Sequence, residues 1–231
     1  STEEFARKML IPYTQGADES WAENAQRTQE MVAKRARYHI VHSWRGKVSD
    51  LMMGICEAAN HGGPQPHKPE ELLDLQWHQQ NRPTNLDEYF FVCPFAVNQH
   101  TINKVRLGHP DCQIDKFHLV AQTICREPQS ALILIMDGSR WTLKRSCCLE
   151  ELHGAITSTP SFNIRYCGAH SLEPITVDAK YAGAHNKKVK KRIDDKIRRN
   201  PGFPAFNERI QSHVDDYIAK QKTALGAAMS Q

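Results

Sequence analysis

The feature that most constrains the fold of this chain is an alternation of short apolar runs with segments of helical periodicity. The clearest run, Ala131–Met136, is apolar at every position, which is typical of a strand covered on both faces. Between the runs, apolar residues recur at helical spacing, as on the inner face of a helix. The alternation predicts a central parallel sheet with right-handed crossover helices.

The expected elements follow from these patterns and from the Gly, Pro and Asn residues that separate them. Strands are expected at 38–43, 88–97, 131–137 and 162–167, with 174–177 as a candidate fifth strand. Helices are expected at 48–59, 114–126 and 144–157. Four prolines within 60–86 predict an insertion over the edge or mouth of the sheet. The sequence therefore predicts an α/β domain over 37–177.

The segments on either side of this domain have a different character. Residues 1–36 mix charged residues with weak helical periodicity, which predicts an N-terminal helical cover. Residues 187–199 contain eight basic and two acidic residues, a net charge of +6 against +4 for the whole chain. An apolar stripe through this tail is interrupted at 200–204 by Pro and Gly. We therefore expect 178–231 to form two helices that pack back on the domain.

Size and composition fit a single globular domain with extensions, at 231 residues, 40% hydrophobic and 24% charged. The longest apolar run is far shorter than the roughly 20 residues of a membrane-spanning helix. The first residues are acidic and lack the apolar segment of a signal peptide. Seven cysteines without a C-x-x-C pair favour reduced thiols and no metal site. We expect an intracellular location, in the cytoplasm or, after processing, in an organelle such as the mitochondrion.

Three short motifs occur in a characteristic order. Residues 39–46 read His-Ile-Val-His-Ser-Trp-Arg-Gly, 89–100 contain Phe-Phe-Val-Cys-Pro-Phe before Asn-Gln-His, and 144–152 read Lys-Arg-Ser-Cys-Cys-Leu-Glu-Glu-Leu. In their order and separation they resemble the TIR-like (Toll/interleukin receptor-like) domains that are abundant in algal and protist proteins. The resemblance implies a flavodoxin-like, TIR-like three-layer fold, with the N-terminal helical extension and the C-terminal helical tail added to it.

The resemblance also implies a candidate catalytic residue. In catalytic TIR domains the Glu of the third motif is associated with cleavage of NAD at the nicotinamide–ribose bond, and it maps onto Glu151. A carboxylate suits this reaction because it can stabilise an oxocarbenium-like ribose. The alternative is a Glu151 that is solvated or paired with Arg145. The chain departs from the family pattern at Val41, where the family has Ser, and at Cys147, where it has Trp.

Four further residues are candidates for lining a ligand pocket at the carboxyl ends of the strands: His42, Trp44, Asn98 and Asp137. Each also has a structural interpretation. His42 and Asn98 would then hydrogen-bond neighbouring loops, Trp44 would pack as a buried wedge, and Asp137 would stabilise the turn after its strand. No Gly-rich phosphate loop is present in the sequence.

The basic segment supplies the candidate partner-binding residues, which are Lys187, Lys188, Lys190, Lys191, Arg192, Arg198 and Arg199. Nucleic acid is the less favoured partner, because two Asp residues interrupt the segment and no aromatic residues are interleaved with the cations. A solvated helix face or an acidic protein partner is favoured instead.

Two functions remain open at this point. The substitutions in the motifs favour a non-catalytic scaffold or accessory subunit, which needs no cofactor and joins a larger assembly or self-associates. Such an assembly could include a membrane complex. The alternative is a TIR-type NAD nucleosidase (glycohydrolase) with NAD as its substrate and Glu151 as its catalytic carboxylate.

Overall fold

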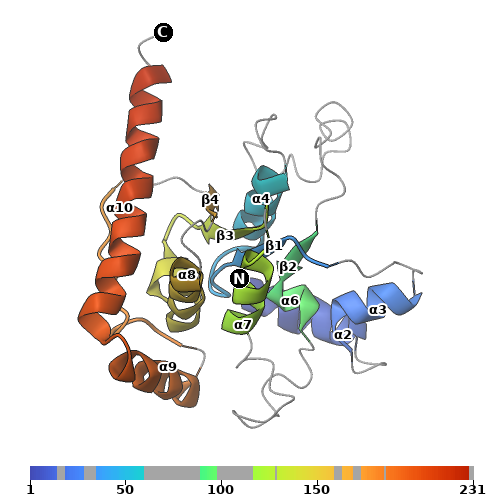
Figure 1. The fold of residues 1–231 in the computed structure, drawn as a ribbon. Coiled ribbons are helices and arrows are strands. Elements are labelled where there is room, and N and C mark those ends of the chain that lie inside the picture. Colours follow the sequence, from blue (N-terminus) through green and yellow to red (C-terminus); the bar gives the residue numbers. More distant parts are fainter. Residues whose placement is uncertain are drawn as a thin grey trace.

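The computed structural model describes residues 1–14, 19–28, 35–59, 89–97, 117–127, 129–158, 163–168, 173–184 and 186–228. The Pro-rich insertion expected at 60–86 lies outside these ranges. Within them, helices lie on both faces of a parallel sheet (Figure 1). The chain is an α/β protein with three layers, as its sequence predicts.

The strands of the described sheet are parallel and follow the order β2-β1-β3-β4. They are β1 (Tyr38–Val41), β2 (Phe90–Val92), β3 (Ala131–Met136) and β4 (Ile164–Gly168). β3 lies between β1 and β4 and is buried at every position, which explains its unbroken apolar sequence. Because the strands are parallel, their carboxyl ends meet at one edge of the sheet, where α/β proteins usually bind ligands.

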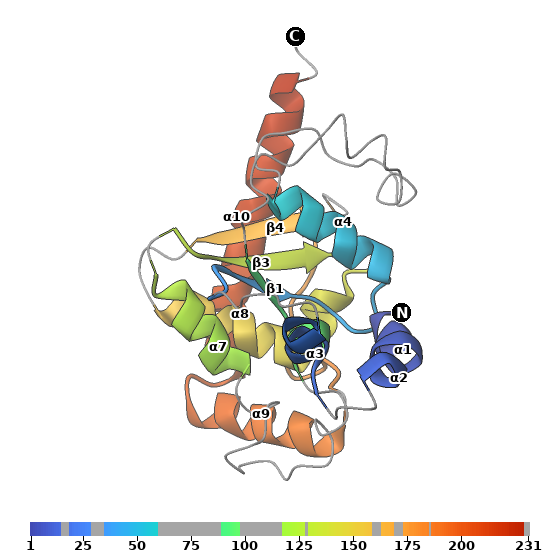
Figure 2. The same cartoon turned by 90° about the vertical axis from the view of Figure 1, so that its right-hand side faces the viewer.

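Helices pack on the two faces of this sheet (Figure 2). On one face α4 (Val48–Ala59) contacts β3 and β4, and on the other face α7 (Phe117–Cys125) and α8 (Ser146–Ser158) contact β1. Successive strand residues point to opposite faces. Ile133 accordingly belongs to the apolar cluster under α4, and Leu134 to the cluster under α8.

The second strand is shorter than the sequence pattern suggests. The strand expected at 88–97 ends at Val92, and Cys93–Ala96 form the short helix α6. Pro94 lies in the first turn of that helix, where its missing N–H is tolerated, whereas it could not donate to a strand ladder. The aromatic run is therefore split between a strand and a helix.

The prediction of a fifth strand at 174–177 is wrong. In the structure this segment has no regular secondary structure and pairs with no strand among the described residues. The side-chain carbonyl of Gln211 accepts a hydrogen bond from the Val177 N–H at 2.8 Å, and its amide donates to the Ile175 carbonyl at 2.8 Å. A side chain thus satisfies backbone groups that a neighbouring strand would otherwise bind.

The N-terminal segment forms short helices beside α6 (Figure 1). They are α1 (Thr2–Phe5), the π-helical turn η1 (Ala6–Leu10), α2 (Ile11–Thr14) and α3 (Trp21–Thr28). The ring of Phe95 in α6 lies 6.1 Å from that of Phe5 and 5.6 Å from that of Trp21. The Thr2 N–H donates to the Gly46 carbonyl at 2.8 Å, which ties the start of the chain to the loop after β1.

The basic tail forms the two expected helices, α9 (Lys187–Arg199) and α10 (Phe203–Ala228). Their apolar stripes are buried in the same core cluster as α7 and α8, through residues Val189, Ile193, Ile197, Phe206, Ile210 and Val214. The tail therefore packs back on the sheet domain by way of α8. In the described residues, no helix combines the length and the apolar character needed to cross a membrane.

Candidate functional site

The candidate catalytic carboxylate is engaged in a buried hydrogen bond. Glu151 projects from α8 toward β1, where Nε2 of His39 lies 2.7 Å from its Oε2. The side chain of His39 is 1% exposed and that of Glu151 is 11% exposed. Because a carboxylate accepts hydrogen bonds, Nε2–H of the imidazole is the donor. Glu151 is thus neither solvated nor paired with Arg145, and it links the helix to the sheet.

Trp44 lies on the same side of the sheet as this pair. Its indole Nε1–H donates to Sγ of Cys93 at 3.1 Å. Burial raises the pKa of the Cys93 thiol well above its ordinary value, and the nearby negative charge of Glu151 raises it further. The Phe91 ring stacks on His39 at a centroid distance of 5.3 Å. Trp44 therefore packs as a partly buried wedge next to the buried pair.

Two adjacent thiols border the carboxylate on α8. Sγ of Cys147 and Sγ of Cys148 are 4.0 Å apart, and Cys148 also donates to the His42 carbonyl at 3.3 Å. The hydrogen bond between the thiols lowers the pKa of Cys147 and raises that of Cys148. The family's Trp position thus carries a small thiol that is half-buried against its neighbour.

His42 lies on the opposite face of the sheet from Glu151. It lines a cavity of about 10 Å³ together with Leu51 of α4 and Ile135 of β3. Both ring nitrogens are buried without a hydrogen-bond partner among the described residues. Burial lowers the pKa of His42 to about 3, so the imidazole is neutral at pH 7. The structure therefore does not bring His42 and Glu151 into one pocket.

Asp137 fulfils the turn role that its position suggests. Its Oδ1 accepts hydrogen bonds from the N–H groups of Ser139 at 3.0 Å and Trp141 at 3.2 Å. Its Oδ2 is buried without a partner in the described structure, and the residue lines the same cavity as His42. A cavity of about 10 Å³ holds roughly one water molecule and is too small for a ribose.

The remaining pocket candidate, Asn98, falls outside the described ranges. Arg45 follows Trp44 in the first motif. The Arg45 side chain is exposed, and its guanidinium carbon lies 5.2 Å from the centre of the Trp141 ring. Arg45 is thus directed to the surface next to Trp141. Of the candidates, the structure groups Trp44 with Glu151, and His42 with Asp137.

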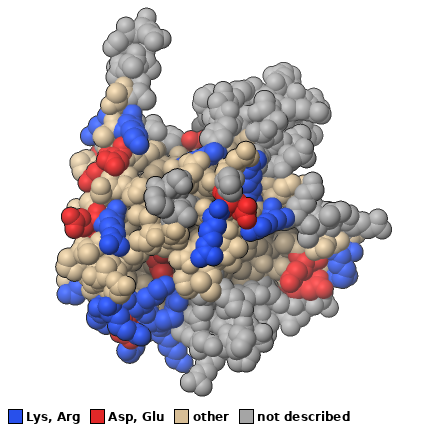
Figure 3. All heavy atoms as spheres, in the orientation of Figure 1, with Lys and Arg blue, Asp and Glu red and all other residues tan. Residues whose placement is uncertain are grey.

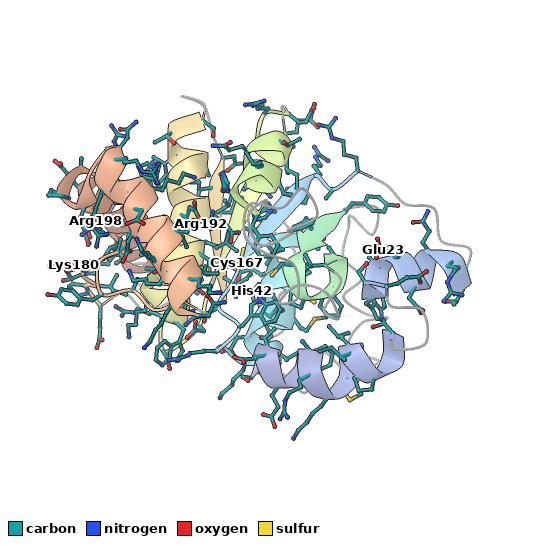
Figure 4. The ribbon with its side chains drawn as sticks, turned by 90° about the horizontal axis from the view of Figure 1, so that it is seen from below. Glu23, His42, Cys167, Lys180, Arg192 and Arg198 are labelled. Carbon is teal, nitrogen blue, oxygen red and sulfur yellow. The ribbon has the colours of Figure 1, made fainter. Side chains whose placement is uncertain are left out.

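The basic residues of α9 fall into two groups. Arg192 and Lys196 each donate to the buried carboxylate of Glu150 at 2.9 Å, which fixes α9 on α8. Lys190, Lys191, Arg198 and Arg199 bond to Asp194 or Asp195 on the helix itself, whereas Lys187 and Lys188 are exposed. Figure 4 shows Arg198 and Lys180 at the outer side of the molecule, away from His42.

Two residues that organise this region were not singled out by the sequence analysis. His39 occupies an inward position of an apolar strand, and a polar residue there signals a buried partner. Glu150 precedes the candidate carboxylate on a helix that a strongly basic segment could reach. Neither signal specifies the partner, because the pairs span more than 40 residues: Glu150 with Arg192, and His39 with Glu151.

No metal centre is evident in the part of the chain that the structure describes, where no three His, Cys, Asp or Glu side chains are arranged to hold an ion. The chain matches no protein-family model, and comparison with curated proteins and with solved structures revealed no significant similarity.

Proposed function

We propose that this chain is a non-catalytic, TIR-like scaffold or accessory subunit that joins a larger assembly through protein–protein contacts. The observation that carries the proposal is the hydrogen bond of 2.7 Å between the buried side chains of His39 and Glu151. The residue to which the motif assigns catalysis is used to attach α8 to β1. The strand order β2-β1-β3-β4 supports the fold assignment, since it is the order of the first four strands of flavodoxin-like sheets.

A catalytic Glu151 would have to leave its partner. Stabilising a ribosyl cation requires the carboxylate to face the sugar. Breaking the contact would leave both Glu151 and the 1%-exposed His39 without this bond in a buried setting, which is costly. The residues around it are apolar or thiol groups, such as Phe91, Cys93 and Cys147. These surroundings suit a structural contact better than a nucleotide site.

The tail supports an interaction role. α9 uses Arg192 and Lys196 to attach itself to Glu150, and several cations remain on its outer side. Cations beyond those needed for attachment contribute little to folding when they are exposed. Charge of one sign on one face promotes association with a partner of opposite charge.

One observation favours the alternative, a TIR-type NAD hydrolase. Glu151 and Trp44 lie on the same side of the sheet, near the carboxyl end of β1, where α/β proteins usually bind ligands. In that case His39 would position the carboxylate, and substrate binding would have to expose it.

Native size distinguishes a subunit from an isolated protein. An epitope-tagged chain, expressed in the cells that make it, is expected to migrate in native gels with a mass well above its own 26.3 kDa. Glu151→Gln keeps a hydrogen-bond acceptor for His39 and is expected to migrate in the same complex. Migration of the wild-type chain as a monomer in fresh extract would contradict the proposal.

A further inference from the structure

A groove runs between α9 and the segment that precedes it. It has a volume of about 460 Å³, and its walls include Ala182, Gly183, Lys187, Lys191 and Arg198. A cavity of this size accommodates a short stretch of extended chain or a few side chains. The groove is lined by described residues and lies outside the Glu151 region.

The wall opposite α9 is held in place by α8 and the turn before it. The Gly183 N–H donates to the Lys144 carbonyl at 2.9 Å, and the Gly183 carbonyl accepts from the Ser146 N–H at 2.8 Å. The Ser146 hydroxyl also donates to the Ala182 carbonyl at 2.9 Å. These bonds make the wall rigid, so a partner would meet a preformed groove and would bind with a small ordering cost.

The groove carries a net positive charge. Four cations line it, Lys187, Lys190, Lys191 and Arg198, and the neighbouring carboxylates are Asp194, which pairs with Lys190, and Asp195, which pairs with Lys191 and Arg198. Figure 3 shows the same imbalance as a cluster of Lys and Arg over α9, at the lower left of the molecule. The Lys190 ammonium donates hydrogen bonds to Asp194 and to the Ala179 carbonyl. Lys187, in contrast, is exposed and has no ion-pair partner in the described structure.

The charges in the first turn of α9 are unfavourable for the helix. Lys187 and Lys188 occupy it, and no acidic residue does. The amino end of a helix carries a partial positive charge, so a cation there is unfavourable. Folding therefore does not account for these two lysines, and an acidic group bound alongside them would offset the cost.

An exposed aromatic residue adjoins the groove. Tyr181 precedes Ala182 in the wall and is 80% exposed, and the Lys180 ammonium lies 5.6 Å from the centre of its ring. Tyrosine on a surface rich in cations is a common anchor of protein interfaces. The core gains nothing from a ring in this position.

We infer that this groove binds an extended acidic segment of a partner protein, with a carboxylate against Lys187, further carboxylates that share Lys191 and Arg198 with Asp195, and an apolar side chain against Tyr181. The inference rests on the proposed scaffold function and assigns its docking surface. A peptide fits better than a nucleic acid, because Asp194 lines the groove and Tyr181 is the sole large aromatic residue among the described residues exposed to this extent.

Binding of a defined probe tests the inference on the full chain. The probe is a fluorescent peptide of alternating Glu and Ala with a central Phe, and its control has Gln in place of Glu. We expect the Glu peptide to bind at least about tenfold more tightly than the Gln peptide, with affinity that falls as salt rises. Equal affinity for the two peptides, or tighter binding of an oligouridylate of equal charge, would overturn the inference.

Charge reversal locates the site. Lys187→Glu with Lys188→Glu is expected to weaken peptide binding by about tenfold or more, while Tm stays the same or rises, because acids suit the first turn of a helix. The matched control reverses Lys220 and Lys222, which are exposed on α10. Equal loss in both double variants would show that only net charge matters.

The native complex separates failure of this inference from failure of the scaffold proposal. If the wild-type chain and the Lys187→Glu/Lys188→Glu variant both migrate in the larger complex, the groove is not the docking surface, although the scaffold proposal stands. If the wild-type chain is monomeric, the scaffold proposal itself fails. Loss of the complex in this variant alone supports both.

Discussion

At the scale of single residues, the main role of Glu151 is to attach α8 to β1. Its carboxylate lies 2.7 Å from Nε2 of His39, and the two side chains are almost completely buried. A buried polar group that loses its partner costs about 1–3 kcal/mol, and more if it is charged. The pair should therefore affect stability more than any reaction.

We expect Glu151→Ala to lower the free energy of unfolding by about 2–4 kcal/mol, because it removes the partner of His39 and opens a cavity. Glu151→Gln should cost less than half as much, since its carbonyl can still accept from the imidazole. Urea denaturation followed by circular dichroism measures both. Two equally stable variants would show that the hydrogen bond contributes little.

His42 makes stability depend on pH. Its folded-state pKa is lowered to about 3 by burial, and next by the charge of His39, whereas the unfolded value is near 6.5. Between these values the unfolded chain binds the proton more readily, so stability falls as pH drops from about 6.5 toward 3. The stabilising contribution is fully present above pH 6.5.

A variant isolates this contribution from that of the other histidines. His42→Leu leaves no hydrogen-bond partner unsatisfied in the described structure. Lys47, Asp50 and Asp137 line the same cavity and remain unchanged in it. Between pH 7 and pH 4 the wild type should lose up to about 3 kcal/mol more than His42→Leu in urea denaturation. Parallel pH profiles for the two proteins would contradict the assignment.

At the scale of helices and strands, close packing explains the presence of a glycine that helix propensity disfavours. Gly54 lies inside α4, where Gly is normally unfavourable. A Cβ at this position would clash with Cδ1 of Ile135 and crowd its Cγ2. Gly154 in α8 has more space, since a Cβ there would lie 3.6 Å from Nε2 of Gln122.

The two helical glycines should respond to the same substitution with opposite sign. Gly54→Ala is expected to lower stability by about 1–2 kcal/mol, because α4 must shift or Ile135 must leave its rotamer. Gly154→Ala should raise stability by about 0.5–1 kcal/mol through helix propensity alone. Thermal unfolding of both variants provides the measurement. A stabilising Gly54→Ala would show that α4 is not packed as closely as described.

The local pattern of apolar residues predicts a strand or helix well where one periodicity dominates. The apolar run of β3 and the helical spacing of α4 placed both elements closely. The pattern failed at 88–97, where Pro94 starts a helix within an aromatic run, and at 174–177, where Gln211 replaces a strand. Both misses depend on which groups satisfy the backbone, and periodicity does not contain that information.

At the scale of the whole molecule, the arrangement of the layers explains why the candidate pocket was only partly predictable. The motifs name residues at the ends of strands and helices, and the parallel sheet does bring Trp44 to the side of Glu151. His42 follows Val41 in the chain and so points to the other face, toward Leu51 and Ile135. The face that each residue occupies follows from the alternation of side chains along β1. The buried pair of His39 and Glu151 does not follow from this alternation, because the two residues are far apart in the sequence.

We propose that Glu151 holds the structure together and performs no chemistry, and a measurement of nicotinamide release tests this proposal most directly. Purified wild-type protein and folded Glu151→Gln are incubated with NAD at high protein concentration, so that self-association cannot limit activity, and free nicotinamide is quantified by chromatography. We predict no release by the wild type above that of the variant. Release by the wild type that Glu151→Gln abolishes, with its fold intact by circular dichroism, would contradict the account and establish the hydrolase.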